Sequence, residues 1–218
     1  MAILGRMDAN ESLATSAGDD AGNGAIPRAV ILVEGVSDQV TLQVLARRRG
    51  RDLAAERVHI VSMNGATNIG HFLDRYGPRG LDVKLAGLYD IAEERFFQRG
   101  LERAGFSQAG LSSGSESGLA RNDLEALGFF VCSADLEDEL IRALSPEAVE
   151  RIVEAEGEIR SFRTLQQQPA LREWSLHDQL RRLMSGRSGG KEKYARLMAE
   201  AIGLDQVPRP LDAVLDHI

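Results

Sequence analysis

The chain has 218 residues, 43% of them hydrophobic, and a formal net charge of −7. This length fits one domain or one domain with an appendage, and the acidic charge excludes a generally basic surface that holds nucleic acid by charge alone. The one cysteine, Cys132, cannot form an internal disulfide, and no apolar run approaches the ~20 residues of a membrane span. Because the N-terminus also has no signal-peptide pattern, we expect a soluble, cytoplasmic protein without membrane association.

Short apolar runs alternate with helical patterns along most of the chain. Residues 1–26 are polar and contain several glycines, which predicts a disordered tail. We predict strands over residues 29–33, 58–61, 84–89 and 128–132. We predict helices from residue 36 to about 49, over 68–75 and 91–103, and from about 136, with a flexible loop over 107–122. This alternation indicates an α/β domain over 27–145, with a compact parallel sheet of about four strands flanked by helices. Residues 146–218 form a helical C-terminal extension that we expect to complete the site.

Carboxylates follow three of the predicted strands. Glu34 ends the first strand, Asp90 ends the third, and Asp135 and Glu137 follow the fourth, while Asp38 lies in the first turn of the helix after Glu34. The carboxyl ends of parallel strands converge at one edge of a sheet, where such acids repel one another unless a cation neutralises them. Oxygen ligands favour Mg²⁺ or Mn²⁺ over zinc. A single acid of this kind is more often a helix cap, but three strand ends with acids indicate a metal site.

The motifs that carry these acids resemble the TOPRIM domain of the OLD (overcoming lysogenisation defect) family nucleases. Leu32-Val33-Glu34-Gly35-Val36-Ser37-Asp38 is similar to the first motif, and Gly87-Leu88-Tyr89-Asp90 is similar to the approach to the aspartate motif. Asp135-Leu136-Glu137-Asp138-Glu139-Leu140 resembles the later acidic motif, and the glycine-rich segment 186–193 resembles the last element, which carries a lysine. The four motifs occur in the family's order, and the resemblance covers about residues 28–200.

The resemblance implies a TOPRIM (Rossmann-like) fold and metal-dependent cleavage of DNA with two cations, Mg²⁺ or Mn²⁺. It implies that Glu34 and Lys191 are catalytic, with Lys191 stabilising charge on the cleaved phosphate. The implied metal ligands are Glu34, Asp38, Asp90, Asp135 and Glu137. Family members of full length carry an ATPase domain before this one, which this sequence does not contain, so we expect a stand-alone version or a fragment. We expect DNA as a partner and consider a separate ATPase protein and a homodimer as further assemblies.

The chain departs from the family at the aspartate motif, where two aspartates are separated by one residue. Here Asp90-Ile91-Ala92-Glu93-Glu94 places Ala92 at the second position, and alanine cannot bind a metal. Glu93 is an alternative ligand, although a shift of one residue on a helix turns the side chain by ~100°. The departure puts binding of the second cation, and therefore catalysis, in question. The main alternative to a nuclease is a non-catalytic module that binds metal or a partner protein.

Basic residues near Lys191 are the candidates for contact with the DNA backbone: Arg181, Arg182, Arg187 and Lys193. Lys193 is also an alternative for the family's lysine, but it lies about 200° around the predicted helix from Lys191. Residues 186–192 imitate a phosphate-binding loop, but their glycine spacing is one residue short and no strand precedes them, so we reject an ATP site. Tyr89 and Cys132 lie in predicted buried strands, where packing is the expected role.

Overall fold

The fold is built on one sheet of four parallel strands. The computed structural model describes residues 26–106 and 119–218. The strands are β1 Ala29–Val33, β2 Val58–Ser62, β3 Lys84–Asp90 and β4 Phe129–Cys132, and they lie in the order β2-β1-β3-β4. In this register Ile31 is paired with Ile60 on one side and with Ala86 on the other. Because the chain leaves β1 for β2 on one side and then returns to β3 on the opposite side, the order of the strands switches between β1 and β3.

The sheet is covered on both faces, as the apolar composition of its strands requires. Every residue of β1 is fully buried. Ile31 and Val33 contribute to the hydrophobic core on one face, whereas Val30 and Leu32 contribute to the core on the other. This alternation follows from the two-residue period of a strand. The strand therefore holds the residue that follows it, Glu34, at a fixed position at the edge of the sheet.

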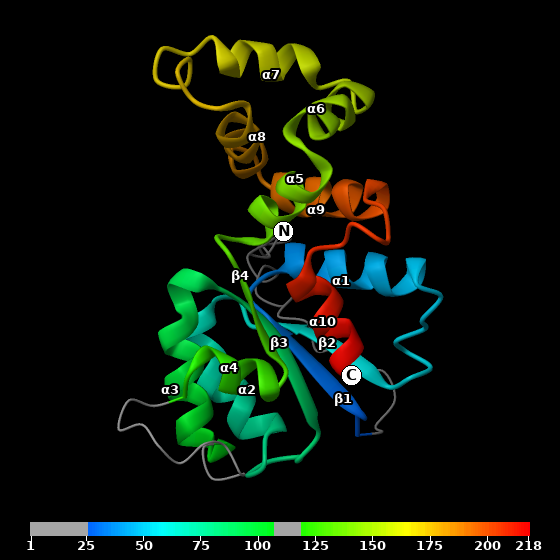
Figure 1. The fold of residues 1–218 in the computed structure, drawn as a ribbon, viewed down its shortest axis with the longest axis vertical. Helices are drawn as coiled ribbons and strands as arrows, with labels where there is room; N and C mark the ends of the chain where they lie inside the picture. The colour runs from blue at the N-terminus through cyan, green and yellow to red at the C-terminus, as the bar shows by residue number, and fades with distance from the viewer. Residues whose placement is uncertain (1–25, 107–118) are drawn as a thin grey trace, which may run out of the picture.

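Helices α2 (Ile69–Tyr76), α3 (Glu94–Ala104) and α4 (Arg121–Ala126) cover one face of the sheet. Helices α1 (Val36–Arg48) and α10 (Arg209–His217) cover the other face (Figure 1). Two short 3₁₀ turns, η1 (Ala66–Asn68) and η2 (Ile91–Glu93), precede α2 and α3. Both turns follow the carboxyl end of a strand, so they help to form the edge at which the acidic residues gather.

Five further helices, α5 to α9, lie beyond that edge of the sheet in Figure 1. They are α5 Leu136–Leu144, α6 Pro146–Ala155, α7 Ile159–Gln166, α8 Leu176–Ser185 and α9 Gly190–Ala201. Helix α9 packs along α1 and against α5, and α10 returns to the sheet beside β3 and β4. The C-terminal helices therefore share a core with the sheet and carry their own side chains to its edge. In the described part of the chain, none of the helices is both long enough and apolar enough to cross a membrane.

The predicted strands are confirmed within one residue at each end, and the predicted helical C-terminal part is confirmed as well. Two details were wrong. The predicted helix over 91–103 begins with the 3₁₀ turn η2, and its α-helical part starts at Glu94. The loop predicted over 107–122 extends too far, because α4 already begins at Arg121; its six residues bury only Leu124, a pattern too short to recognise. The rest of that loop and the predicted tail fall in residues 107–118 and 1–25, outside the described residues.

Candidate metal centre

The first group of acids gathers where β1 and β3 end. Glu34, Asp90 and Glu93 each offer one carboxylate oxygen, and these oxygens all lie within 4.8 Å of one another. Glu34 directly follows β1, Asp90 is the last residue of β3, and Glu93 closes the turn η2. The three side chains are half-buried. Three carboxylates at this separation repel one another strongly unless a cation or protons neutralise them.

Burial and repulsion between neighbouring carboxylates both raise pKa values in this cluster. Burial raises the pKa of Asp90 to about 8, with further contributions from Glu34 and Asp38. Burial and the neighbouring Glu34 raise the pKa of Glu93 to about 7. One oxygen of Glu93, Oε2, is buried without a hydrogen-bond donor among the described residues. Protons or a bound cation would remove the repulsion among these carboxylates.

Asp38 stands beside this cluster and has a partner of its own. Its carboxylate accepts a hydrogen bond from the backbone N–H of Gly35 at 2.9 Å, which caps the first turn of α1. Burial raises its pKa to about 6, and Glu137 and Glu34 add to the shift. The predicted ligand thus has a structural role at the start of α1.

The second group of acids comes from the start of α5. Asp135 caps this helix by accepting a hydrogen bond from the backbone N–H of Asp138 at 2.9 Å, and it forms an ion pair with Arg181. Glu137 is buried, with a side chain only 5% exposed, and its Oε2 lies 3.2 Å from Nζ of Lys191. Its other oxygen, Oε1, has no donor among the described residues.

Glu34 and Asp90 of the first group and both acids of the second group line one groove of about 500 Å³. The predicted ligands Glu34, Asp38, Asp90, Asp135 and Glu137 all contribute to its wall, together with Lys191 from α9. Asn64 and Gly65, which follow β2, close the groove on the side of that strand. The structure therefore brings the predicted ligands and the predicted lysine to one place, from four segments that are far apart in the sequence.

Lys191 is held in the groove by acids. Burial opposes its charge, but Glu137, Asp135 and Asp90 together raise its pKa, so the ammonium form is retained. Its side chain is still 54% exposed, which leaves Nζ accessible to a ligand in the groove. Lys193 faces elsewhere, with Nζ at 2.8 Å from Glu156 and 2.7 Å from Glu158. The predicted separation of the two lysines around α9 is confirmed.

The other basic residues that were predicted to contact DNA differ in whether an acid already pairs with them. Arg181 is occupied by Asp135, and Arg187 contacts Glu158 at 3.0 Å and also Ser161. Arg182 makes no ion pair with any residue that the structure describes and lines a second cavity next to the groove. Their contact with DNA, like that of Lys193, stays a prediction.

Residues set aside as structural behave as predicted. Tyr89 is 1% exposed and stacks on Phe97, with ring centroids 4.8 Å apart, and Cys132 is also 1% exposed. The glycine-rich segment before Lys191 joins α8 to α9 and follows a helix, whereas a phosphate-binding loop follows a strand.

The order of the strands, the acids at their ends and the helices beyond the edge can be compared with known proteins. Residues 27–91 match the model of the "Overcoming lysogenization defect protein-like, TOPRIM domain" family. The C-terminal region of the Burkholderia pseudomallei OLD protein superimposes with a TM-score of 0.65 at 21% identity, covering 88% of this chain and 96% of that one. The chain has an OLD-type TOPRIM fold.

A second solved structure gives the same result. The C-terminal region of the Xanthomonas campestris pv. campestris OLD protein has a TM-score of 0.64 at 23% identity, covering 88% of this chain and 92% of that one. A comparison with curated proteins found no match. The family model ends at Ile91, one residue after Asp90, so the departure at Ala92 lies just beyond it. The fold resemblance, in contrast, extends into the C-terminal helices.

The chemistry of the OLD-type TOPRIM edge fits a hard divalent cation. Its ligand candidates are all carboxylate oxygens, which Mg²⁺ and Mn²⁺ prefer, and no histidine or cysteine joins the cluster among the described residues. Oε2 of Glu93 and Oε1 of Glu137 are buried and have no hydrogen-bond donor in the described part of the chain, which fits oxygens able to bind a cation. Glu93, at the end of the turn η2, brings a carboxylate oxygen within 4.8 Å of those of Glu34 and Asp90, whereas Ala92 has no side-chain oxygen to offer.

Proposed function

We propose that this protein is a divalent-metal-dependent DNA nuclease that hydrolyses phosphodiester bonds. The observation that carries the proposal is the placement of Lys191 in the same groove as the carboxylates that end β1 and β3. A carboxylate cluster alone repels DNA, whereas a cluster filled by cations and accompanied by a lysine attracts a phosphate. The fold resemblance to the OLD proteins supports the same reaction class.

In this proposal the two groups of acids divide the work of metal binding. Glu34, Asp90 and Glu93 hold one Mg²⁺ or Mn²⁺, and Asp135 and Glu137 hold a second when Arg181 and Lys191 release them. A bound cation of this kind polarises a phosphate oxygen and lowers the pKa of bound water. Because Asp90 and Glu93 hold protons near neutral pH without metal, loading of the site releases those protons.

Lys191 has a separate task. Its partly exposed side chain lines the groove, and its ammonium group can donate to a non-bridging phosphate oxygen. Negative charge grows on that oxygen as the phosphate is attacked, so a fixed ammonium stabilises the transition state more than the ground state. Before a second cation binds, Glu137 holds Lys191 in the groove through the contact of 3.2 Å, and about half of the lysine side chain is exposed, at 54%.

A test uses supercoiled plasmid incubated with pure protein and Mg²⁺ or Mn²⁺. The wild-type protein should nick or linearise the plasmid, and EDTA should stop the reaction. Glu34→Gln and Lys191→Ala should each reduce the rate by roughly 100-fold or more. Lys193→Ala is the matched control. It also removes a lysine charge from α9, but the side chain of Lys193 contacts Glu156 and Glu158 instead of the groove.

A non-catalytic metal-binding or partner-binding module is the second candidate. The ion pairs of Asp135 with Arg181 and of Glu137 with Lys191 favour it, because they already neutralise the second group of acids. Ala92 favours it as well, since it removes a family ligand. Wild-type protein that binds Mn²⁺ but never cuts plasmid would establish this candidate and exclude the nuclease.

A further inference from the structure

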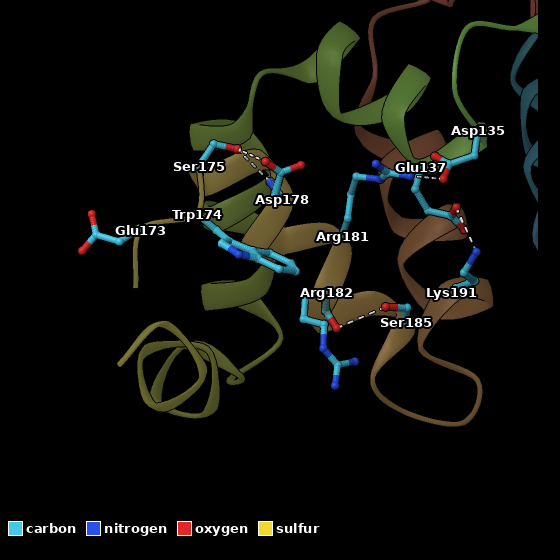
Figure 2. Close-up of a pocket in the computed structure, with 10 residues that line it drawn as sticks. All are labelled: Asp135, Glu137, Glu173, Trp174, Ser175, Asp178, Arg181, Arg182, Ser185 and Lys191. Atoms are coloured by element: carbon cyan, nitrogen blue, oxygen red, sulfur yellow. Dashed lines mark hydrogen bonds and ion pairs between the residues drawn. The ribbon is translucent and has the colours of Figure 1, made fainter. Parts of the chain in front are cut away.

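A second cavity of about 670 Å³ opens beside the groove, between α5, α8 and α9. It shares Asp135, Glu137 and Lys191 with the groove, so the two spaces adjoin each other. Its volume lies within the ~300–1,000 Å³ that is typical of small-molecule sites. Figure 2 shows its wall, in which Trp174 and Arg182 lie on the side away from the acids of α5.

Trp174 is the unusual member of this wall. It is the one tryptophan of the chain, and 47% of its surface is exposed. Its main chain is held in place, because its backbone N–H donates to the carbonyl of Leu171 at 3.0 Å and the next residue, Ser175, caps α8. A large aromatic ring that is open to a cavity offers a flat apolar face to a ligand.

Most of the charged side chains that line the cavity have a partner among the described residues. Asp135 is paired with Arg181, Glu137 with Lys191, and Asp178 with Ser175 and His177. The carboxylate of Glu173 points away from the other lining side chains in Figure 2. Arg182 therefore remains as the basic group that no ion pair occupies within the described ranges, and it lines the same cavity as the exposed ring.

We propose that Trp174 and Arg182 form a binding site for one unpaired nucleotide of the DNA strand that occupies the groove. The base stacks on the indole ring and a phosphate next to it contacts the guanidinium. Aromatic rings stack with every base regardless of sequence, and arginine is suited to phosphate oxygens. This inference rests on the proposed nuclease function for the strand in the groove, but the site itself can be measured without cleavage.

The consequence for the substrate is specific. A paired base within a duplex has both faces covered by its neighbours, so it can reach Trp174 only after it leaves the stack. The site therefore selects DNA that offers an unpaired nucleotide near the cleaved phosphate, such as a single strand, a frayed end or a flap. Continuous duplex fills the groove without using this site.

Intrinsic fluorescence tests the site directly, because Trp174 is the only tryptophan that can respond. The Glu34→Gln protein with Mg²⁺ is titrated with a short single-stranded oligonucleotide, and the comparison ligand is a closed hairpin duplex of the same composition. Stacking should quench the emission with the single strand and much less with the hairpin. An unchanged emission at saturation, with binding followed by the anisotropy of a labelled oligonucleotide, would overturn the proposal.

Substitutions separate stacking from charge. Trp174→Ala should weaken binding of the labelled single strand roughly five- to a hundredfold, the range that loss of one stacked base gives, and Trp174→Phe should restore most of it. Arg182→Ala should weaken binding and reduce its salt dependence, whereas Arg160→Ala should do neither, since that exposed arginine of α7 does not line the cavity. Equal effects of the two arginine substitutions would contradict the site.

The outcomes keep the two proposals apart. If wild-type protein never cuts plasmid but the single strand quenches Trp174, the nucleotide site stands and the nuclease proposal fails. If the protein cuts plasmid but Trp174→Ala binds and cuts single strands and duplexes in the wild-type ratio, the nuclease proposal stands and the nucleotide site fails.

Discussion

Removal of Lys191 should change stability in a way that depends on metal. Without it, the carboxylate of Glu137 loses the one hydrogen-bond donor that it has among the described residues. An exposed ion pair contributes about 0–1 kcal/mol, whereas breaking a fully buried pair costs about 3–5 kcal/mol. Here the side chain of Glu137 is 5% exposed and that of Lys191 is 54% exposed, so the cost of breaking this pair should lie between the two values.

We therefore expect Lys191→Ala to lower the free energy of unfolding by roughly 1–3 kcal/mol in EDTA, the cost of leaving one buried acceptor unpaired. For a domain of this size that corresponds to a loss of roughly 2–12 °C in melting temperature. Mn²⁺ should remove much of this loss, because a cation at Glu137 replaces the charge of the lysine. Mn²⁺ affinity itself should be unchanged or higher in the variant.

Thermal unfolding of the wild-type protein and the variant, each with EDTA and with saturating Mn²⁺, measures both effects. Lys193→Ala is the control, because its partners Glu156 and Glu158 are 32% and 21% exposed and belong to no candidate metal site. Its loss of stability should be smaller and independent of metal. A Lys191→Ala protein that is as stable as the wild type in EDTA, or equally destabilised with and without Mn²⁺, would refute the reasoning.

Further outcomes follow from the same geometry. In EDTA, the free energy of unfolding should rise as the pH falls from about 8 to about 6. The carboxyl groups of Asp38, Glu93 and Asp90 have folded-state pKa values of about 6, 7 and 8, so they bind protons that the unfolded chain does not. Urea titrations in which the stability of the metal-free protein rises with pH across this window would contradict this. Stabilisation by Mn²⁺ should instead grow with pH in the same titrations, since bound ligands are deprotonated. Glu93→Gln should weaken Mn²⁺ binding roughly tenfold or more in calorimetry, whereas Ala92→Asp should change it by less than about twofold; the reverse order would show that Glu93 is not a ligand. Gly87→Ala should destabilise by about 1–3 kcal/mol, because its new Cβ would lie 2.7 Å from an aromatic carbon of β4, while Gly70→Ala, with nothing within 4 Å, should be neutral or stabilising; equal denaturation midpoints would contradict the packing.

The sheet could be predicted from the sequence because its strands are buried on both faces. A continuous apolar run such as Val30–Val33, ended by an acid and a glycine, has few other interpretations in a chain of this composition. The same logic placed Glu34 and Asp90 at the edge of the sheet, where the structure has them. The short helix α4 escaped prediction because it buries one residue and follows a glycine- and serine-rich run.

The acids at the start of α5 could be assigned to the site from their motif, but their contacts could not be predicted from the sequence pattern. The sequence gives no sign that Arg181 reaches Asp135, 46 residues away, because that contact depends on how α8 packs beside α5. Glu93 was open as an alternative ligand, and the 3₁₀ turn that directs it toward Glu34 is not visible in a helical pattern. Trp174 gave no periodic signal, since it lies in the turn before α8.

The central claim is that the carboxylates at the ends of β1 and β3 hold a divalent cation. An anomalous difference map from crystals grown or soaked with Mn²⁺ tests it most directly. We predict a peak bound by Glu34, Asp90 and Glu93, absent in the Glu34→Gln protein, with any second peak at Asp135 and Glu137. Crystals at saturating Mn²⁺ with no peak at these three carboxylates, or with the same peak in Glu34→Gln, would contradict the account.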